Sequence, residues 1–418
     1  MRISTIQAFN NGVQGLQRNY ANATRTQEQI STGNRILTPA DDPVASVRLL
    51  QLEQQQNVLS QYKDNLTAAK NSLSQEEVTL NSVNTILQRV RELAVQAGNG
   101  VLNQTDRQSI AAELGEREDE LLGLMNTRNA RGEYLFAGFQ GKSQPFVRQA
   151  DGSYSYAGDE GQRKLQVASS LGLAISDSGK KIFERVTNAG RLDSALTLSP
   201  PGSSLSVSAA LVQDEVAFSG ALPFPPAGVQ VLFGNPDAAS YEVSEIGVPA
   251  PAPVLASGKL DADPDKSDRL VFRGVTVQFD GAAVGGETVQ ITADPTREKQ
   301  GILSTIANLR TSLESAPNTP TGNRQTRDAV AVALTNLDHG MSSVDGVRGE
   351  IGARLNIIES TQTDNEDVSL VNKGVQADLR ELDYAEALSR LSFQSIILDA
   401  AQQSYVKISS LNLFNQLR

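Results

Sequence analysis

The feature that most constrains this chain is an unbroken heptad repeat in its first hundred residues. Apolar residues recur at every seventh position: Ala45, Leu52, Leu59, Leu66, Leu73, Leu80 and Leu87. The companion positions of the repeat are also apolar and are occupied by Tyr62, Ala69, Val83, Val90 and Ala97. Glu76 is the exception among them. Such a repeat is typical of a helix that packs along another helix. It predicts one helix over residues 43–97, roughly 80 Å long at about 1.5 Å per residue, and so a rod.

The start of this helix has its own signals. Asp42 suits the capping position, and Pro43 suits the first helical position, where its missing N–H costs nothing. The paired carboxylates of Asp41 and Asp42 leave an alternative, a metal site or an acid/base pair. Capping is the stronger interpretation, because carboxylates at a helix N-terminus are stabilised by free backbone N–H groups and by the helix dipole.

Both ends of the chain are predicted amphipathic helices. Residues 1–30 carry two series spaced by seven, and a last helical stretch over 368–413 carries a less regular one. The remaining N-terminal positions are mostly uncharged amides and hydroxyls, which can face water or pack against a neighbour. We expect the two ends to pair as one coiled coil and to carry assembly, through Ile6, Phe9, Val13, Leu16, Ala23, Ile30, Leu382, Leu391, Leu398, Leu411, Leu413 and Phe414. The alternative, that these residues only fill the core of their own chain, stays open.

The rest of the chain divides into a helical part and a β-rich insert. Helices are predicted over 106–126, 302–313 and 330–358, and a small β hairpin over 154–175. The fold class is mainly α with an inserted β domain, in which an antiparallel helical rod is built from both termini. Three domains are expected. They are a terminal coiled coil (1–42 with 376–418), a helical rod (43–190 with 295–375) and an acidic outer β domain (191–294).

The insert is acidic and rich in Pro and Gly. Its Asp and Glu exceed its Lys and Arg by eight, out of a net charge of −11 for the chain. Alternating runs over 229–233 and 275–279 predict strands. The acidic run of Asp261, Asp263, Asp265 and Asp268 lacks a complete calcium-loop pattern, so a solvated outer surface is the favoured interpretation.

Composition excludes several classes of function. The chain has no Cys and one His, which rules out disulfides, thiolate or His-rich metal sites, and most triads. His339 is predicted to be an exposed helix residue, and we predict no catalytic, cofactor-binding or metal-binding residues. Gly141-Lys142-Ser143 resembles the end of a phosphate loop, but Phe136 stands where the upstream Gly is required.

Charge and hydropathy bear on partners. The acidic balance argues against nucleic acid, because phosphate binding needs clustered Lys and Arg. No apolar stretch of about 18 residues predicts a membrane span, and the first residues lack a cleavable Sec signal. A membrane-active helical translocator is a further alternative, but the terminal helices lack the basic face of interfacial helices.

Several motifs resemble the terminal regions of flagellin-type proteins of the bacterial flagellum. The N-terminal ones are Ser31-Thr32-Gly33-Asn34-Arg35-Ile36, Pro39-Ala40-Asp41-Asp42-Pro43-Val44, and the segments 87–100 and 131–138. At the other end, segments 382–391 and 410–415 resemble the C-terminal helix of hook–filament junction proteins. The resemblance covers about residues 1–190 and 295–418. The start Met1-Arg2-Ile3-Ser4-Thr5 and the stretch from Tyr134 to Phe146 favour the junction proteins over filament flagellin, which remains the alternative.

The resemblance implies a secreted structural protein rather than an enzyme. Members of this family are exported uncleaved through the flagellar type III apparatus, after binding a cytoplasmic chaperone. It further implies a ring of copies outside the cell, between hook-associated protein 1 and the flagellin filament. Neither nucleic acid nor membrane is an implied partner.

Overall fold

The computed structural model describes residues 5–100, 102–249, 251–261, 263 and 266–416, and within the terminal helices the side chains of 5, 6, 8 and 408–416 lie outside that description. The chain forms two compact units: the first is residues 1–66 with 359–418, and the second is residues 67–358. The described α-helices are α1 (Thr5–Thr32), α2 (Pro43–Ala97), α3 (Gln104–Met125), α4 (Glu215–Ser219), α5 (Ile302–Ser315), α6 (Pro320–Arg380) and α7 (Tyr384–Gln416).

The heptad repeat is confirmed as one continuous helix of 55 residues, α2. Its Leu66, Leu73, Leu80 and Leu87 are almost completely buried. The predicted start is also confirmed, because the Asp42 carboxylate accepts the N–H of Ala45 at 3.0 Å, and Pro43 is the first helical residue. The last turn of the repeat ends at Ala97, directly before Gly98.

The C-terminal helices differ from the prediction. The expected boundary near residue 368 is wrong, because α6 runs without a break to Arg380. The sequence between 358 and 368 is polar but contains no Gly or Pro, so nothing there interrupts a helix. The true break is at 381–383, where the Asp383 carboxylate accepts the N–H groups of Ala385 and Glu386 and so starts α7.

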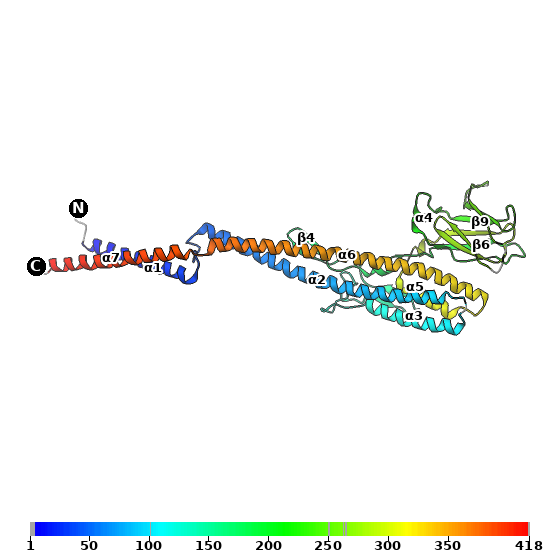
Figure 1. Cartoon of the computed structure of the whole chain (residues 1–418), viewed down its shortest axis with the longest axis horizontal. Helices are drawn as coiled ribbons and strands as arrows, with labels where there is room; N and C mark the ends of the chain where they lie inside the picture. Colours follow the sequence, from blue (N-terminus) through cyan, green and yellow to red (C-terminus); the bar gives the residue numbers. More distant parts are fainter. Residues whose placement is uncertain (1–4, 101, 250, 262, 264–265, 417–418) are drawn as a thin grey trace. The chain divides into compact units, whose positions relative to one another are not determined.

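The helical part of the second unit is a bundle with an aliphatic core. Helices α3 and α5 pack side by side (Figure 1). Leu114, Leu121, Leu309 and Leu313 are buried on these two helices. Helix α3 begins earlier than predicted, because Asn103 and Asp106 form a capping box. Aliphatic packing therefore supplies the core, as expected for a chain with few aromatic residues.

Glu76, the exception in the heptad repeat, is buried in a charged cluster. Only 1% of the residue is exposed, and its Oε1 accepts the N–H of Asp177 at 3.2 Å. Asp177 is fully buried and accepts two hydrogen bonds from Arg354, at 2.7 and 3.1 Å. Burial, and then the negative charge of Asp177, raise the pKa of Glu76 well above its ordinary 4.5, although Arg354 and Arg163 act in the opposite direction.

This raised pKa predicts a pH-dependent stability. Protonated Glu76 stabilises the fold fully below pH 4.5, and the contribution is lost as the pH rises through the raised folded pKa. Glu76→Gln stays neutral and keeps the acceptor for Asp177, so at pH 8 it should be more stable than the parent, on the order of 1 kcal/mol. Urea midpoints measured from pH 5 to pH 8 test this, and parallel curves for the two proteins would contradict it.

Small strands lie beside the helices. The single hairpin predicted over 154–175 is wrong, because these residues contribute to two hairpins. Tyr154–Tyr156 (β2) pairs with Phe146–Arg148 (β1), and Lys164–Ala168 (β3) pairs with Leu171–Ala174 (β4). A further pair joins Val186–Thr187 (β5) to Lys299–Gln300 (β15). The turns η1 (Lys180–Glu184, a π-helix) and η2 (Pro295–Arg297, a 3₁₀ helix) complete these connections.

The acidic insert is a sandwich of two antiparallel sheets. One has the strand order β11-β10-β9-β14-β6, and the other has β12-β13-β7, with β8 also pairing β13. Both predicted strands are present, as β9 and β13. Side chains of the two sheets meet in one core, where the rings of Phe233 and Phe279 lie 5.4 Å apart. The strands are β6 (Leu192–Leu198), β7 (Ser206–Val207), β8 (Leu211–Val212), β9 (Val229–Phe233), β10 (Ser240–Glu245), β11 (Val254–Lys259), β12 (Asp268–Phe272), β13 (Val275–Asp280) and β14 (Thr288–Ala293).

Two residues singled out by the sequence have structural contacts. His339 is half-buried rather than exposed, and its Nδ1 lies 2.8 Å from the carbonyl oxygen of Thr187, which joins α6 to β5. In the acidic run, the Asp268 carboxylate accepts the N–H of Asp261, and Asp261 accepts that of Asp263. Asp265 lies outside the described residues. Among the helices that the structure describes, none has both the length and the hydropathy to cross a membrane.

Candidate assembly interface

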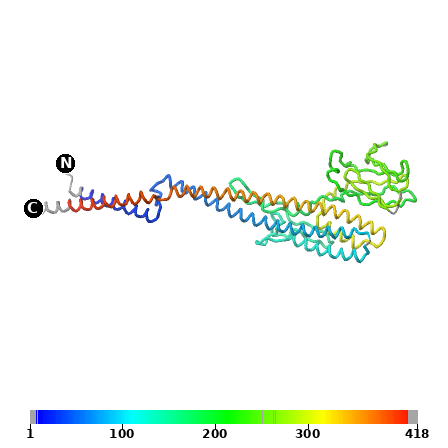
Figure 2. Tube along the Cα trace, viewed as in Figure 1, coloured from blue at the N-terminus to red at the C-terminus, as the bar shows by residue number. Residues whose placement is uncertain are grey.

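The two terminal helices of the first unit pair with each other. In Figure 2 the blue N-terminal and red C-terminal helices run side by side in opposite chain directions, so α1 and α7 are antiparallel. The rings of Phe9 and Tyr405 lie 5.4 Å apart, and Thr26 donates to Oε1 of Gln394 at 2.8 Å. The Tyr405 ring also packs over Gly12, where an added Cβ would lie in ordinary contact with the ring at 3.4 Å.

The predicted seam residues lie along this pair with partial burial. Phe9 is half exposed, whereas Val13, Leu16, Ala23 and Ile30 of α1 are half-buried. On the C-terminal side, Leu391 and Leu398 are half-buried. Leu382, which lies in the break between α6 and α7, is buried. The side chains of four predicted residues lie outside the described part of the chain: Ile6, Leu411, Leu413 and Phe414.

A second apolar surface on α7 was missed by the heptad prediction. Leu388, Phe393, Ile396 and Ile397 are exposed, and for Phe393 and Ile396 the exposed fractions are 67% and 66%. At about 100° per residue Phe393, Ile396 and Ile397 lie on the sides of α7 away from the Leu391 and Leu398 seam, whereas Leu388 lies beside that seam. The sequence signal was available, because a helix that is apolar on every side is normally buried on every side. We call Phe393, Ile396 and Ile397 the α7 outer face.

The same unit exposes further apolar side chains near the start of α2. Val44, Val47 and Leu50 are each more than half exposed, and Leu370 and Val371 of α6 are exposed as well. The unpartnered apolar surface of the first unit therefore continues beyond α1 and α7.

The turn that joins α1 to α2 is fastened to the break between α6 and α7. Arg35 donates its backbone N–H to the Arg380 carbonyl at 2.8 Å, and Leu382 donates to the Gly33 carbonyl at 3.0 Å. Within the turn, the Asp41 carboxylate accepts the N–H groups of Leu37 and Thr38, both at 2.9 Å, and pairs with Arg25. The paired Asp residues therefore cap and close this turn, as the sequence indicated.

Gly33 should be difficult to replace. It ends α1 with a φ of 70°, and a Cβ there would lie 2.8 Å from the Tyr384 hydroxyl. Gly33→Ala should therefore lose about 1–2 kcal/mol of unfolding free energy, measured by circular dichroism during thermal unfolding. The control is Gly15→Ala within α1, where no atom lies within 4 Å of a new Cβ, and which should gain about 0.5–1 kcal/mol. Equal effects at the two positions would refute the strain argument.

Comparisons with known proteins agree with this architecture. Residues 3–141 match the bacterial flagellin N-terminal helical region. The flagellar hook-associated protein 3 of Escherichia coli is 36% identical over 188 residues, which is 45% of this chain and 58% of that protein. A flagellin of Clostridium tyrobutyricum is 22% identical over 394 residues, covering 94% of this chain and 95% of that one. The crystal structure of the flagellar junction protein FlgL from Legionella pneumophila has a TM-score of 0.60 at 26% identity, covering 80% of this chain and 100% of that one.

The N-terminal region of the chain is therefore similar to that of bacterial flagellins, and its fold is similar to that of a flagellar junction protein. The identity is higher with hook-associated protein 3 of Escherichia coli, at 36% over 188 residues, than with the Clostridium flagellin, at 22% over 394 residues. The matched part spans 58% of the length of that hook-associated protein.

Proposed function

We propose that this chain is a structural subunit of the bacterial flagellum, outside the cell at the junction between hook and filament. Its role is attachment rather than catalysis. The similarity to a hook-associated protein 3 and to a structurally characterised junction protein supports this assignment. The terminal helices supply the physical basis, because they carry the apolar surface that attachment requires.

The observation that carries the proposal is that α7 is apolar on more sides than α1 can cover. Phe393 and Ile396 leave about two thirds of their surface in water in the single chain. Full burial of such a side chain stabilises an assembly by about 1.5–3 kcal/mol. Several such residues on one helix are enough to favour association with neighbouring subunits over solvent exposure.

The same surface explains how assembly could be coupled to order. Amphipathic helices with little tertiary support are marginal in water, and they gain stability when neighbours provide the missing apolar partner. Before export, a chaperone would cover this surface. In the assembled flagellum, other copies in a ring would cover it, together with hook-associated protein 1 on one side and flagellin on the other.

The roles of the chain's parts follow from the same proposal. Residues 1–42 and 376–418 form the assembly domain, 43–190 with 295–375 form the rod, and 191–294 form the acidic outer domain. The seam residues of the assembly domain, from Ile6 to Ile30 and from Leu391 to Phe414, position the α7 outer face. Leu382 is buried in the break between α6 and α7, so it stabilises the assembly domain from inside the same chain.

Filament-forming flagellin is the second candidate, because the Clostridium flagellin aligns along 94% of this chain. Seeded growth distinguishes the two. Purified protein added to isolated hooks that carry hook-associated protein 1 should add a short terminal layer and stop, as seen by electron microscopy. Continued growth into long filaments would overturn the junction proposal in favour of flagellin.

A further inference from the structure

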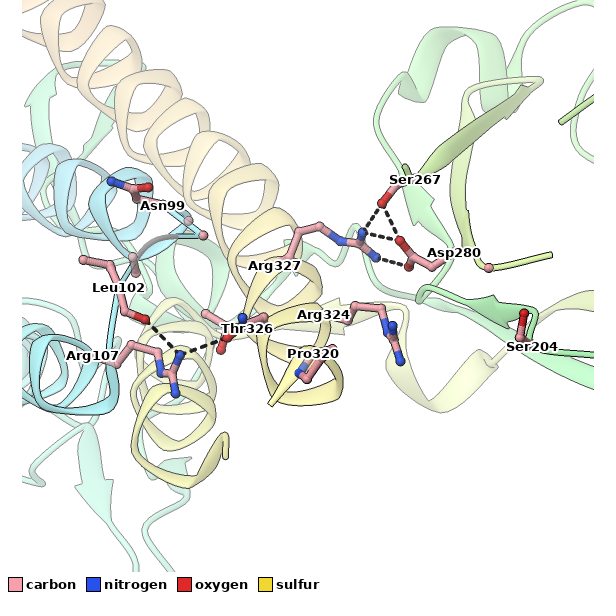
Figure 3. A pocket seen from close by; sticks show the side chains of 15 residues that line it. Asn99, Leu102, Arg107, Ser204, Ser267, Asp280, Pro320, Arg324, Thr326 and Arg327 are labelled. Atoms are coloured by element: carbon pink, nitrogen blue, oxygen red, sulfur yellow. Dashed lines mark hydrogen bonds and ion pairs between the residues drawn. The ribbon is translucent and has the colours of Figure 1, made fainter. Parts of the chain in front are cut away.

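The second unit contains a cavity of about 880 Å³ that the assembly role does not use. It lies between the turn that follows α2, the first turns of α6, and loops of the β sandwich (Figure 3). Arg107 of α3 also lines it, so both the helices and the β sandwich contribute to its wall. Cavities of this size accommodate small-molecule ligands in other proteins.

The wall of the cavity is positively charged, in contrast to the acidic chain. Its charged residues are Arg107, Arg324, Arg327 and Asp280. Arg327 pairs with Asp280 through two hydrogen bonds of 3.0 and 2.9 Å and with Asp328 at 3.1 Å, so its charge is offset. Although burial acts in the opposite direction, the bonds from Arg327 and Ser267 hold the pKa of Asp280 below its ordinary value. The net positive charge of the wall therefore comes from Arg107 and Arg324.

In the described part of the chain neither remaining arginine forms an ion pair with a carboxylate, although the charge of Arg324 also helps to lower the pKa of Asp280. Arg107 is 2% exposed, yet it donates only to the carbonyls of Leu102 and Ala316 and to the Asn323 amide, at 3.1–3.3 Å. Arg324 donates to the Thr321 hydroxyl at 3.4 Å. Buried charges in proteins are normally paired, because neutral acceptors offset only part of the desolvation cost.

Two buried polar atoms in the same wall also lack a hydrogen-bond partner. They are Nε of Arg107 and Oγ1 of Thr326, whose residue is 5% exposed. Leaving such an atom unsatisfied costs about 1–3 kcal/mol, so each one calls for an explanation. Both atoms belong to residues that line the cavity.

We infer that this cavity binds a small oxyanion, a molecule with a carboxylate or phosphate group, held by Arg324 and Arg107. Guanidinium groups match the planar geometry of carboxylate and phosphate oxygens and remain charged at every physiological pH. The cavity also adjoins the N-terminus of α6, which begins at Pro320 and adds a favourable partial positive charge. This binding function is independent of the assembly proposal.

Calorimetric titration of the full-length monomer tests the inference, with inorganic phosphate and citrate as probes at constant ionic strength. We expect saturable binding of at least one probe. Arg324→Gln should weaken it at least tenfold. Asp280→Asn removes the negative charge of the wall and should strengthen it severalfold. Arg348→Gln is the matched control, because Arg348 lies on the same helix away from the cavity, and it should bind as the parent does.

Thr326→Val extends the test without removing a charge. If the Thr326 hydroxyl donates a hydrogen bond to the ligand, this variant should bind the ligand more weakly than the parent does. Its thermal stability in ligand-free buffer should stay equal or rise. Absence of saturable binding by both probes would overturn the inference. Equal affinities for the parent and Arg324→Gln would also overturn it, because binding would then occur elsewhere.

Discussion

Phe393→Asp is expected to give a soluble, folded monomer that fails to join an assembled structure. The Phe393 side chain is 67% exposed on α7, so a carboxylate there keeps its water in the single chain, and stability should change by about 0.5 kcal/mol or less. In an assembly the same carboxylate would be buried against an apolar neighbour. A loss of about 3 kcal/mol at such a position lowers incorporation on the order of 100-fold. Sedimentation of hooks after incubation with the variant measures this.

Phe139→Asp is the matched control for that variant. Phe139 is also 67% exposed, but it lies in the second unit, beside the Gly138 turn. It should therefore assemble as the parent does. Equal incorporation of Phe393→Asp and the parent would show that the α7 outer face is not an assembly surface.

Glu118→Ala is expected to produce the largest loss of stability in the second unit. Glu118 of α3 is fully buried, and its two carboxylate oxygens bind Arg148 at 2.9 Å and Arg310 at 3.0 Å. The Tyr154 hydroxyl donates to the same carboxylate. Burial and this contact with Glu118 raise the pKa of Tyr154 to about 12, so the hydroxyl remains protonated and can donate. One carboxylate thus fastens β1, β2 and α5 to α3.

Removing a buried partner of this kind costs about 3–5 kcal/mol, and the loss should lie at the lower end, because Arg148 keeps Asp119 at 2.7 Å and Arg310 keeps Glu314 at 3.1 Å. Urea unfolding of the variant should show that loss. Glu118→Gln keeps the shape and one acceptor, and it should lose less. Glu120→Ala is the control on the same helix, since Glu120 is half exposed in its pair with Arg117 and should change stability by about 0.5 kcal/mol or less. A similar effect at both positions would contradict the assigned role of Glu118.

The helices could be predicted because their signals are local. The heptad repeat ending at Leu87, and the Asp42-Pro43 start, give the period, the cap and the length of α2 within a single stretch of sequence. The end of α6 could not be predicted in this way. Its polar segment after Ile358 weakens the apolar period without stopping the helix, and the break depends on Asp383 and on the partner turn at Gly33.

Features made by distant residues were not visible in the sequence. Glu76 interrupts an apolar seam, but its partner Asp177 lies 101 positions away. Glu118 similarly depends on Arg310, 192 positions further along the chain. The α7 outer face was missed for another reason. The heptad pattern identifies the face toward one partner, whereas Phe393 and Ile396 lie outside that pattern and face away from it.

The most direct test of the central claim is the accessibility of the α7 outer face before and after assembly. The chain has no Cys, so Ile396→Cys supplies a unique thiol whose rate of alkylation reports exposure of that position. Val216→Cys, at a residue of α4 that is 81% exposed, is the reference. The thiol of the Ile396→Cys variant should react readily in the monomer and at least roughly tenfold more slowly in assembled junctions, while the reference thiol reacts alike in both. Equal rates for Ile396→Cys in monomer and assembly would contradict assembly through this face.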